Sequence, residues 1–274
     1  MRQFLRLLAI SMTTALLAAA APAETMKMAV TTSFENSGLG KVLLPEVKKD
    51  LGLNVQLLVV GTGAALRLGA NGDVDAVLVH AKRAELKFMK QGHGLHRRLI
   101  MYNDFILVGP KEDPVGIKKA KTAAQALKMI AAAKAPFVSR GDDSGTNKKE
   151  LALWKEAGFG KPDLRGSWYR AAGAGMGATL NIAAGMNAYT MSDRATWLKF
   201  GNKRDLALLF AGDPKLFNQY TFIPVNPKTH PGVRTDLALK LEDWLTSPKA
   251  AKLINGYRIK GEKLFTFDAK PAPE

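Results

Sequence analysis

The stretch NVQLLVVGTGAALRLGANGDVDAVLVH, residues 54–80, decides the fold class. It begins with an apolar strand at 54–60, passes through a Gly-Thr-Gly turn at 61–63 into a short helix at 64–70, and ends in a second apolar strand at 76–80. Continuous apolar strands joined by helices are typical of a parallel sheet that helices cover on both faces. We therefore expect an α/β fold.

The same alternation extends over the rest of the chain. Apolar spacing predicts further helices at 39–51, 84–91, 122–132, 146–157, 178–184, 235–245 and 248–257. Strands are expected at 27–33, 99–108, 137–139, 188–191 and 222–225.

Composition narrows the function classes. The 274 residues include no cysteine, which excludes thiol nucleophiles, thiolate metal sites, disulfides and lipid attachment through cysteine. The formal net charge of +16 favours anionic partners. The lysines are dispersed rather than interleaved with aromatic residues, so we expect no nucleic-acid partner.

The first residues predict an export signal. Arg2 and Arg6 precede an apolar run at 7–21, and Ala21-Pro22-Ala23 supplies the small-x-small cleavage pattern. The run is shorter than the about 20 residues that cross a bilayer, which disfavours the alternative of a retained anchor. We expect residues 1–23 to be a signal peptide cleaved after Ala23, and the mature protein to be periplasmic without a lipid anchor.

Three short polar loops follow predicted strands, at 31–38, 61–63 and 139–146. In an open parallel sheet such loops gather at the carboxyl edge, where ligands bind. Hydroxyls, glycines and free backbone N–H groups at helix starts suit a small oxyanion. Any one of these loops could equally be an ordinary helix cap. Together they favour a tetrahedral-anion site.

Two other motifs favour different functions. Asp143-Ser144-Gly145 resembles the surroundings of a serine nucleophile, so an exported serine hydrolase is a distant alternative. His93 and His96 lie in a basic turn without a third ligand, and we expect no metal site there.

Longer blocks are more specific. They are TTS at 31–33 with ENSG at 35–38, VGTG at 60–63, MYNDF at 101–105, SRGDDSGT at 139–146, GMGATLN at 175–181, YTMSDR at 189–194, NP at 226–227 and DWLTSP at 243–248. In this combination the chain resembles the tungstate-binding proteins of bacterial ABC importers over nearly all of its length after residue 23.

The resemblance implies a two-lobed type II periplasmic-binding-protein fold, each lobe a mostly parallel sheet flanked by helices. The ligand would lie in the cleft between a first lobe, residues 24–109 and 220–274, and a second lobe, residues 110–219. The chain is expected to cross between them near 108–110 and 217–221. Such a protein is a monomer that delivers its ligand to a membrane permease, without a cofactor and without catalysis.

The resemblance also implies the ligand-binding residues. Thr32, Ser33 and Thr62 would donate from the first lobe. The second lobe would contribute Arg140, Ser144, Gly145 and Thr146, with charge-assisted bonds from Arg140. Arg194 would be a second cation near the site; the alternative is an ion pair with Asp193 or another acid.

Phosphate is the alternative ligand for the same fold. The pattern Arg140-x-Asp142-x-Ser144-Gly145-Thr146 also resembles phosphate-binding proteins, in which the aspartate accepts the proton of hydrogen phosphate. Tungstate and molybdate carry no proton, so a carboxylate that faces them would repel them. The direction of Asp142 therefore separates these ligands, whereas the similar radii of tungstate and molybdate leave that pair open.

Overall fold

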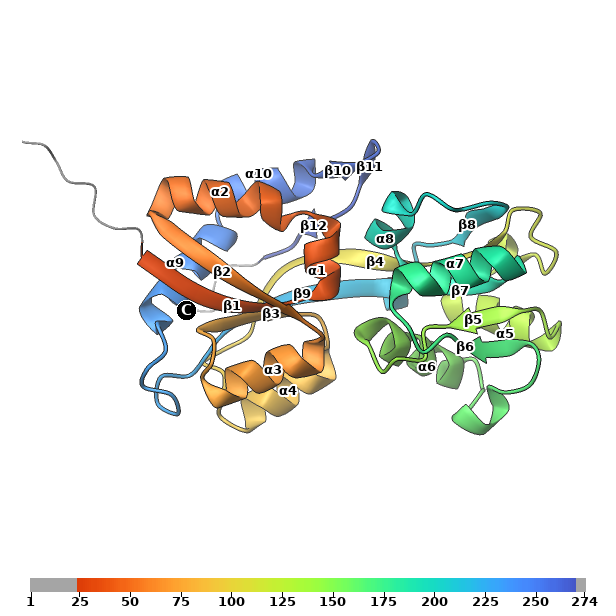
Figure 1. Cartoon of the computed structure of the whole chain (residues 1–274), viewed down its shortest axis with the longest axis horizontal. Coiled ribbons are helices and arrows are strands. Elements are labelled where there is room, and N and C mark those ends of the chain that lie inside the picture. The colour runs from red at the N-terminus through yellow and green to blue at the C-terminus, as the bar shows by residue number, and fades with distance from the viewer. Residues whose placement is uncertain (1–23, 270–274) are drawn as a thin grey trace, which may run out of the picture.

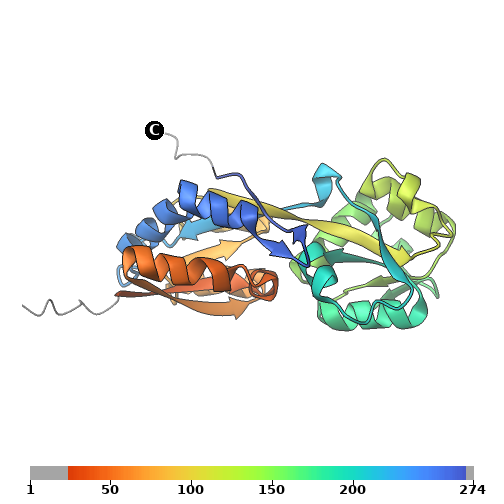
Figure 2. The same ribbon diagram turned by 90° about the horizontal axis from the view of Figure 1, so that it is seen from above.

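The computed structural model describes residues 24–269. Figure 1 shows two lobes side by side, linked by the long strands β4 (Arg98–Pro110) and β9 (Phe217–Pro224). The view from above shows the same two lobes (Figure 2). The predicted signal peptide, residues 1–23, lies outside the residues that the structure describes. Within residues 24–269 no helix has the length and apolar character needed to cross a bilayer.

The left lobe of Figure 1 contains the N-terminal and C-terminal elements. Its elements are β1 (Glu24–Thr31), α1 (Thr32–Ser37), α2 (Gly40–Leu51), β2 (Leu53–Val60), α3 (Thr62–Asn71), β3 (Ala76–Val79), α4 (Lys82–Lys90), α9 (Thr235–Leu245), α10 (Pro248–Gly256), β10 (Arg258–Ile259), β11 (Glu262–Lys263) and β12 (Thr266–Phe267).

The right lobe contains the middle of the chain. Its elements are η1 (Ile117–Lys119), α5 (Ala123–Ala132), β5 (Phe137–Ser139), α6 (Gly145–Glu156), η2 (Lys161–Asp163), β6 (Tyr169–Ala171), α7 (Met176–Met186), β7 (Tyr189–Asp193), α8 (Arg194–Lys199), β8 (Leu206–Phe210) and η3 (Pro214–Leu216).

One sheet runs through both lobes in the order β2-β1-β3-β9-β4-β7-β5-β6, and β8 and β12 also pair with β4. The strands β1, β2 and β3 are parallel, as are β5, β6 and β7. The linking strands β4 and β9 are antiparallel to their neighbours. The predicted α/β class with helix-flanked sheets is confirmed.

Strand β4 changes partners along its length. Up to Asp104 it pairs with β9, and from Phe105 it pairs with β7. This change of partner, between Asp104 and Phe105, comes before the boundary that was predicted between the lobes at residues 109 and 110. The exact limits of the lobes therefore stay a prediction.

Three apolar clusters cover the faces of the sheet. One lies under α3 and α4, and another under α5 and α6 around Trp154. The third runs from Leu43 and Leu241 in the left lobe to Leu180 in the right lobe. The lobes therefore share part of one core.

The main correction concerns the first polar loop. The strand expected at 27–33 ends at Thr31, and residues 32–37 form the short helix α1. The Thr31 hydroxyl accepts a bond from the backbone N–H of Phe34, at 3.3 Å, which caps the helix. The strands β6 and β8, the helix α8 and the short strands β10 to β12 were not expected from the spacing, because each spans six residues or fewer.

Candidate functional site

The three polar loops meet around one residue, His80. His80 follows β3 at the carboxyl edge of the sheet, as the loops do after their own strands. Its Nε2 atom lies 2.9 Å from the Ser33 hydroxyl of the first loop. Gly145 of the third loop lies close to the same imidazole and to Thr62 of the second loop.

Gly145 brings the two lobes together. A Cβ added there would lie 3.0 Å from Cε1 of His80 and 3.9 Å from the Thr62 hydroxyl. The first turn of α6 in one lobe therefore faces the first turn of α3 in the other. A side chain at this position would require the imidazole or the helix to shift by a few tenths of an ångström.

The Ser33 hydroxyl is the centre of a polar network. Besides His80, it contacts the hydroxyl of Thr31 at 2.9 Å and that of Tyr220 at 3.1 Å. Burial raises the pKa of Tyr220, so this phenol stays protonated. Thr32, at the first position of α1, is exposed. The left lobe thus presents uncharged hydroxyl donors.

The third loop holds Arg140 beside an acid. The guanidinium bonds to Oδ2 of Asp142 through Nε at 2.9 Å and Nη2 at 2.6 Å. Its Nη1 lies 3.5 Å from the Thr146 hydroxyl. The other Asp142 oxygen accepts the backbone N–H of Ser144, at 3.2 Å.

These contacts set the charge of Asp142. Burial acts to raise its pKa, but the hydrogen bonds from Ser144 and the charge of Arg140 outweigh burial and leave the pKa below its usual value. Both carboxylate oxygens have protein donors. Asp142 is therefore an ionised acid that pairs within its own loop.

The backbone of this loop depends on Gly141. Its φ of +63° is in the left-handed region, and a Cβ there would lie 2.6 Å from that of Ala171 on β6. After this turn the Ser144 hydroxyl accepts the N–H of Asn147, at 3.2 Å, and caps α6. The capping alternative is therefore confirmed for the Ser144 side chain in this structure.

The buried carboxylate of Glu150 holds the start of the loop 139–146 in place. Glu150 accepts bonds from the hydroxyls of Ser139, at 2.8 Å, and Tyr169, at 2.8 Å, and from the indole of Trp154, at 3.1 Å. The Asn147 amide in turn donates to Ser139, at 3.2 Å. Burial raises the pKa of Glu150, although these bonds oppose the shift.

Arg194, at the first position of α8, is paired with an acid. Its Nε and Nη2 atoms bond to the two oxygens of Asp104, at 2.6 and 2.5 Å. The structure shows the alternative ion pair, with Asp104 as the acid rather than Asp193, and the role of Arg194 as a cation for the ligand stays a prediction. Asp193 instead caps α8 through the backbone N–H of Thr196, at 2.8 Å.

Burial also fixes the charge of His80. Removal from water, with a smaller contribution from the charge of Lys149, lowers the pKa of His80 to about 4. The imidazole is therefore neutral at pH 7. Sequence reasoning missed both His80 and Tyr220. His80 could have been found by the rule applied to the loops, because it is a polar residue at the carboxyl end of a buried strand.

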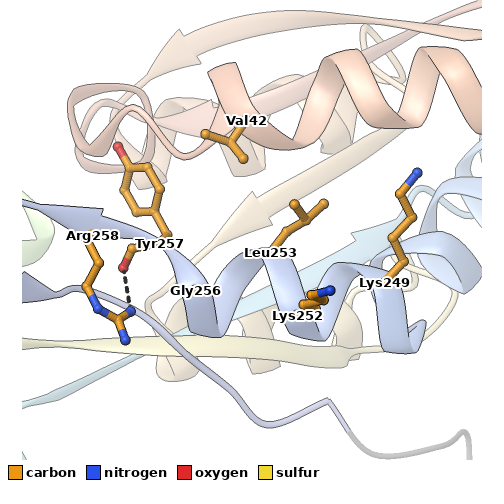
Figure 3. A pocket seen from close by; sticks show the side chains of 7 residues that line it. All are labelled: Val42, Lys249, Lys252, Leu253, Gly256, Tyr257 and Arg258. Carbon is orange, nitrogen blue, oxygen red and sulfur yellow. Dashed lines mark hydrogen bonds between the residues drawn. The ribbon is translucent and has the colours of Figure 1, made fainter.

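Another hollow lies away from this site. Figure 3 shows it between α2 and α10, with Val42 and Leu253 on its apolar surface and a volume of about 570 Å³. At its rim the Lys249 ammonium pairs with Glu46 and Asp50, at 2.6 and 2.7 Å. The residues that line this hollow do not include the cluster of serine and threonine hydroxyls that lies near His80.

The site combines hydroxyls, the first turns of helices and one arginine, while its acid is already paired. Such a set suits an unprotonated tetrahedral anion. Within residues 24–269, no three His, Asp or Glu side chains gather as metal ligands would.

Comparisons with known proteins agree with this geometry. The model of the PBP superfamily domain matches residues 18–249. The tungstate-binding protein TupA of Peptoclostridium acidaminophilum is 46% identical over 246 residues, which cover 88% of this chain and 85% of that protein. The chain belongs to the tungstate-binding protein family. A second member, TupA of Campylobacter jejuni, is 39% identical over 242 residues, covering 87% of this chain and 89% of that protein.

Solved structures of the family have the same fold. The tungstate-binding protein TupA from Desulfovibrio alaskensis G20 superposes with a TM-score of 0.85 at 46% identity, covering 90% of this chain and all of that one. The tungstate ABC transporter protein from Geobacter sulfurreducens gives 0.77 at 52% identity, covering 85% of this chain and 99% of that one. The type II fold expected from the sequence is therefore confirmed.

Proposed function

We propose that this protein binds tungstate or molybdate between its lobes and delivers the anion to an ABC permease. The family membership supports the ligand class. The donors would be Ser33 with Thr32 and Thr62 from the left lobe, and Arg140, Ser144, Gly145 and Thr146 from the right. Gly145 would act through its backbone N–H at the start of α6, and Ser144 through its hydroxyl, since the backbone N–H of Ser144 donates to Asp142.

One observation supports this site above all others. His80 bonds to Ser33 of the first loop, and Gly145 of the third loop lies close to both His80 and Thr62 of the second, so the three loops lie together. Each contact comes from a different part of the chain. A ligand held by all of them would stabilise the closed arrangement of the lobes.

The state of Asp142 favours tungstate over phosphate. Hydrogen phosphate needs an acceptor for its proton, whereas both Asp142 oxygens already accept hydrogen bonds from Arg140 and Ser144, which orient the carboxylate within its own loop. Tungstate and molybdate need donors only. We therefore keep phosphate as the weaker ligand.

The geometry argues against the hydrolase alternative. The Ser144 hydroxyl caps α6, and the histidine of the site bonds to Ser33 instead. With a pKa of about 4, His80 is a weak general base at neutral pH. The proposal is therefore transport without catalysis.

The remaining parts of the proposal follow from the sequence. A signal peptide at residues 1–23, cleaved after Ala23, would send a monomer to the periplasm without a lipid anchor. Residues 24–109 with 220–274, and 110–219, would be the two lobes, and the permease subunits would be the partners.

Thermal unfolding of residues 24–274 tests the ligand. Tungstate and molybdate, each at 1,000 times its Kd, should raise the stability by about 4 kcal/mol, whereas sulfate and phosphate at equal concentration should not. Stabilisation by phosphate alone would transfer the site to the alternative ligand. No effect from any of the four anions would refute an oxyanion site.

A further inference from the structure

The carbonyl end of α1 is held by side chains from both lobes. The last carbonyls of a helix have no partner within the helix itself. The Tyr257 hydroxyl, from the left lobe, donates to the carbonyl of Ser37, at 2.7 Å. The Lys199 ammonium, at the last position of α8 in the right lobe, donates to the carbonyl of Asn36. The right lobe therefore reaches directly onto a helix of the left lobe, and Figure 1 shows α1 and α8 facing each other.

Gly38, which follows α1, leaves room for both donors. Its φ of +80° lies in the left-handed region. A Cβ there would lie 3.0 Å from the Tyr257 hydroxyl and 3.2 Å from the Lys199 ammonium. The two donors thus converge on the same end of the helix.

The bond from Lys199 differs from every other contact of this kind. Among the hydrogen bonds that the structure describes for residues 24–269, it alone joins the two lobes outside the linking strands β4 and β9. The helix that carries it is fixed at its start, where Arg194 pairs with Asp104 of β4. Lys199 extends this attachment from the linking strand to the left lobe.

The other end of α1 belongs to the proposed anion site. Thr32 and Ser33 occupy its first two positions, and the Ser33 hydroxyl contacts His80. At a rise of 1.5 Å per residue, a helix of this length spans about 9 Å. A displacement of its carbonyl end therefore moves the hydroxyls at its first turn.

We propose that Lys199 couples lobe closure to anion binding, because its bond to Asn36 forms only when the lobes are closed and holds α1 where Ser33 meets the anion. This inference rests on the proposed function. Lys199 is a positioning residue, since it contacts the helix and not the anion. A bond that exists only in the closed state stabilises that state, so its loss should speed the release of the anion.

Affinity and release rate give the first test. Lys199→Met removes the donor and keeps the apolar stem, and it should raise the tungstate Kd by about three- to tenfold, the range expected for one hydrogen bond. Most of this change should appear as faster release in stopped-flow displacement, while calorimetry gives the Kd. Lys199→Arg can donate to the same carbonyl and should stay within about twofold of the wild type. Lys128→Met removes an exposed lysine from α5 of the same lobe and should change neither quantity.

The separation of the lobes gives the second test. Because the chain contains no cysteine, spin labels on Lys48→Cys in α2 and Lys155→Cys in α6 would report one position in each lobe. Without an anion, Lys199→Met should shift the distance between the labels away from the value that tungstate selects in the wild type. Tyr257→Phe removes the other bond to α1, which lies within one lobe, and should leave that distance unchanged.

Three results would overturn the inference. They are an unchanged release rate in Lys199→Met, an arginine variant as weak as the methionine variant, and an equal shift of the label distance in the Lys199 and Tyr257 variants. Wild-type protein that binds no tungstate would instead refute the proposed function. In that case the label distances without an anion would still show whether Lys199 holds the lobes together.

Discussion

At the scale of the residue, His80 organises the site although it carries no charge. It lies between the Ser33 hydroxyl and Gly145, and burial keeps it neutral. A neutral imidazole can hold hydroxyl groups in place without adding a charge that changes between pH 5 and 8. The affinity for the ligand is therefore expected to be steady over that interval.

The pKa of His80 predicts how stability changes with pH. In the unfolded chain its pKa is near 6.5, whereas in the folded protein it is about 4. Between these pH values the His80 side chain takes up a proton in the unfolded state but not in the folded state. The free energy of unfolding therefore decreases as the pH falls from 6.5 to 4. The loss should be about 3 kcal/mol.

Urea unfolding at pH 7 and pH 4 measures this loss. The variant His80→Gln has no titrating group at this position. Between pH 7 and pH 4 its free energy of unfolding should therefore decrease by about 3 kcal/mol less than that of the wild type does. NMR titration of the His80 ring in the wild type is an independent check. A ring that titrates near pH 6.5 would contradict the prediction.

Arg140 is predicted to be the main charged donor. Arg140→Ala should weaken tungstate binding by about 2–5 kcal/mol, because it removes a charge-assisted partner of a buried anion. The unfolding transition in the absence of ligand should remain close to that of the wild type. Calorimetry compares it with Arg165→Ala, an exposed arginine of the same lobe that should have no effect. Unchanged affinity in the Arg140 variant would show that the loop at residues 139–146 does not bind the anion.

At the scale of the element, the N-termini of three helices form most of the proposed binding site. α1, α3 and α6 all begin at the carboxyl ends of strands or in the loops after them, and two of the three have a side-chain cap. At α3 the residue before the helix is Gly61, which has no side chain to occupy the first N–H groups. Those groups remain available for a ligand.

The cap of α6 allows stability and binding to be separated. Ser144→Ala removes the acceptor of the Asn147 N–H and should cost about 1 kcal/mol of stability. Ser144→Asp keeps a capping oxygen but adds a negative charge beside the anion. Its stability should match the wild type while its tungstate affinity falls. If the alanine variant unfolds like the wild type, the cap is not the role of this side chain.

The sequence predicted most elements correctly but not all of the site. Long apolar periods, such as those of β2 and α9, are visible without the structure. Helix α1 was missed because five of its six residues are polar and look like a loop until the Thr31 cap is seen. The partner of Arg194 could not be chosen, because Asp104 lies ninety residues away along the chain and meets it only through the pairing of β4 with β7.

At the scale of the whole molecule, binding and lobe closure meet at Gly145. The lobes are joined by β4 and β9, and at the site Gly145 of one lobe lies beside His80 of the other. A branched side chain at that point would have to push the imidazole or the lobes apart, with a typical cost of about 1–3 kcal/mol.

Gly145→Val should therefore reduce tungstate affinity about tenfold or more, while the apolar clusters of the two lobes stay intact. Small-angle scattering should show a smaller decrease of the radius of gyration with tungstate than in the wild type. Gly185→Val is the matched control, since nothing lies within 4 Å of a Cβ at that position. An affinity loss that is equal in both variants would contradict a role for the contact with His80.

The place of β9 in the sheet bears on how the chain acquires its structure. This strand lies between β3 and β4, yet it is made more than a hundred residues after them. A nascent chain that ends before residue 217 leaves the edges of β3 and β4 without the strand that joins them. The N-terminal lobe can thus be completed only after nearly the whole polypeptide is available, and such non-local pairing is slow. A chain that assembles late stays unfolded for longer, which would suit the export through a translocation channel that we propose for this protein.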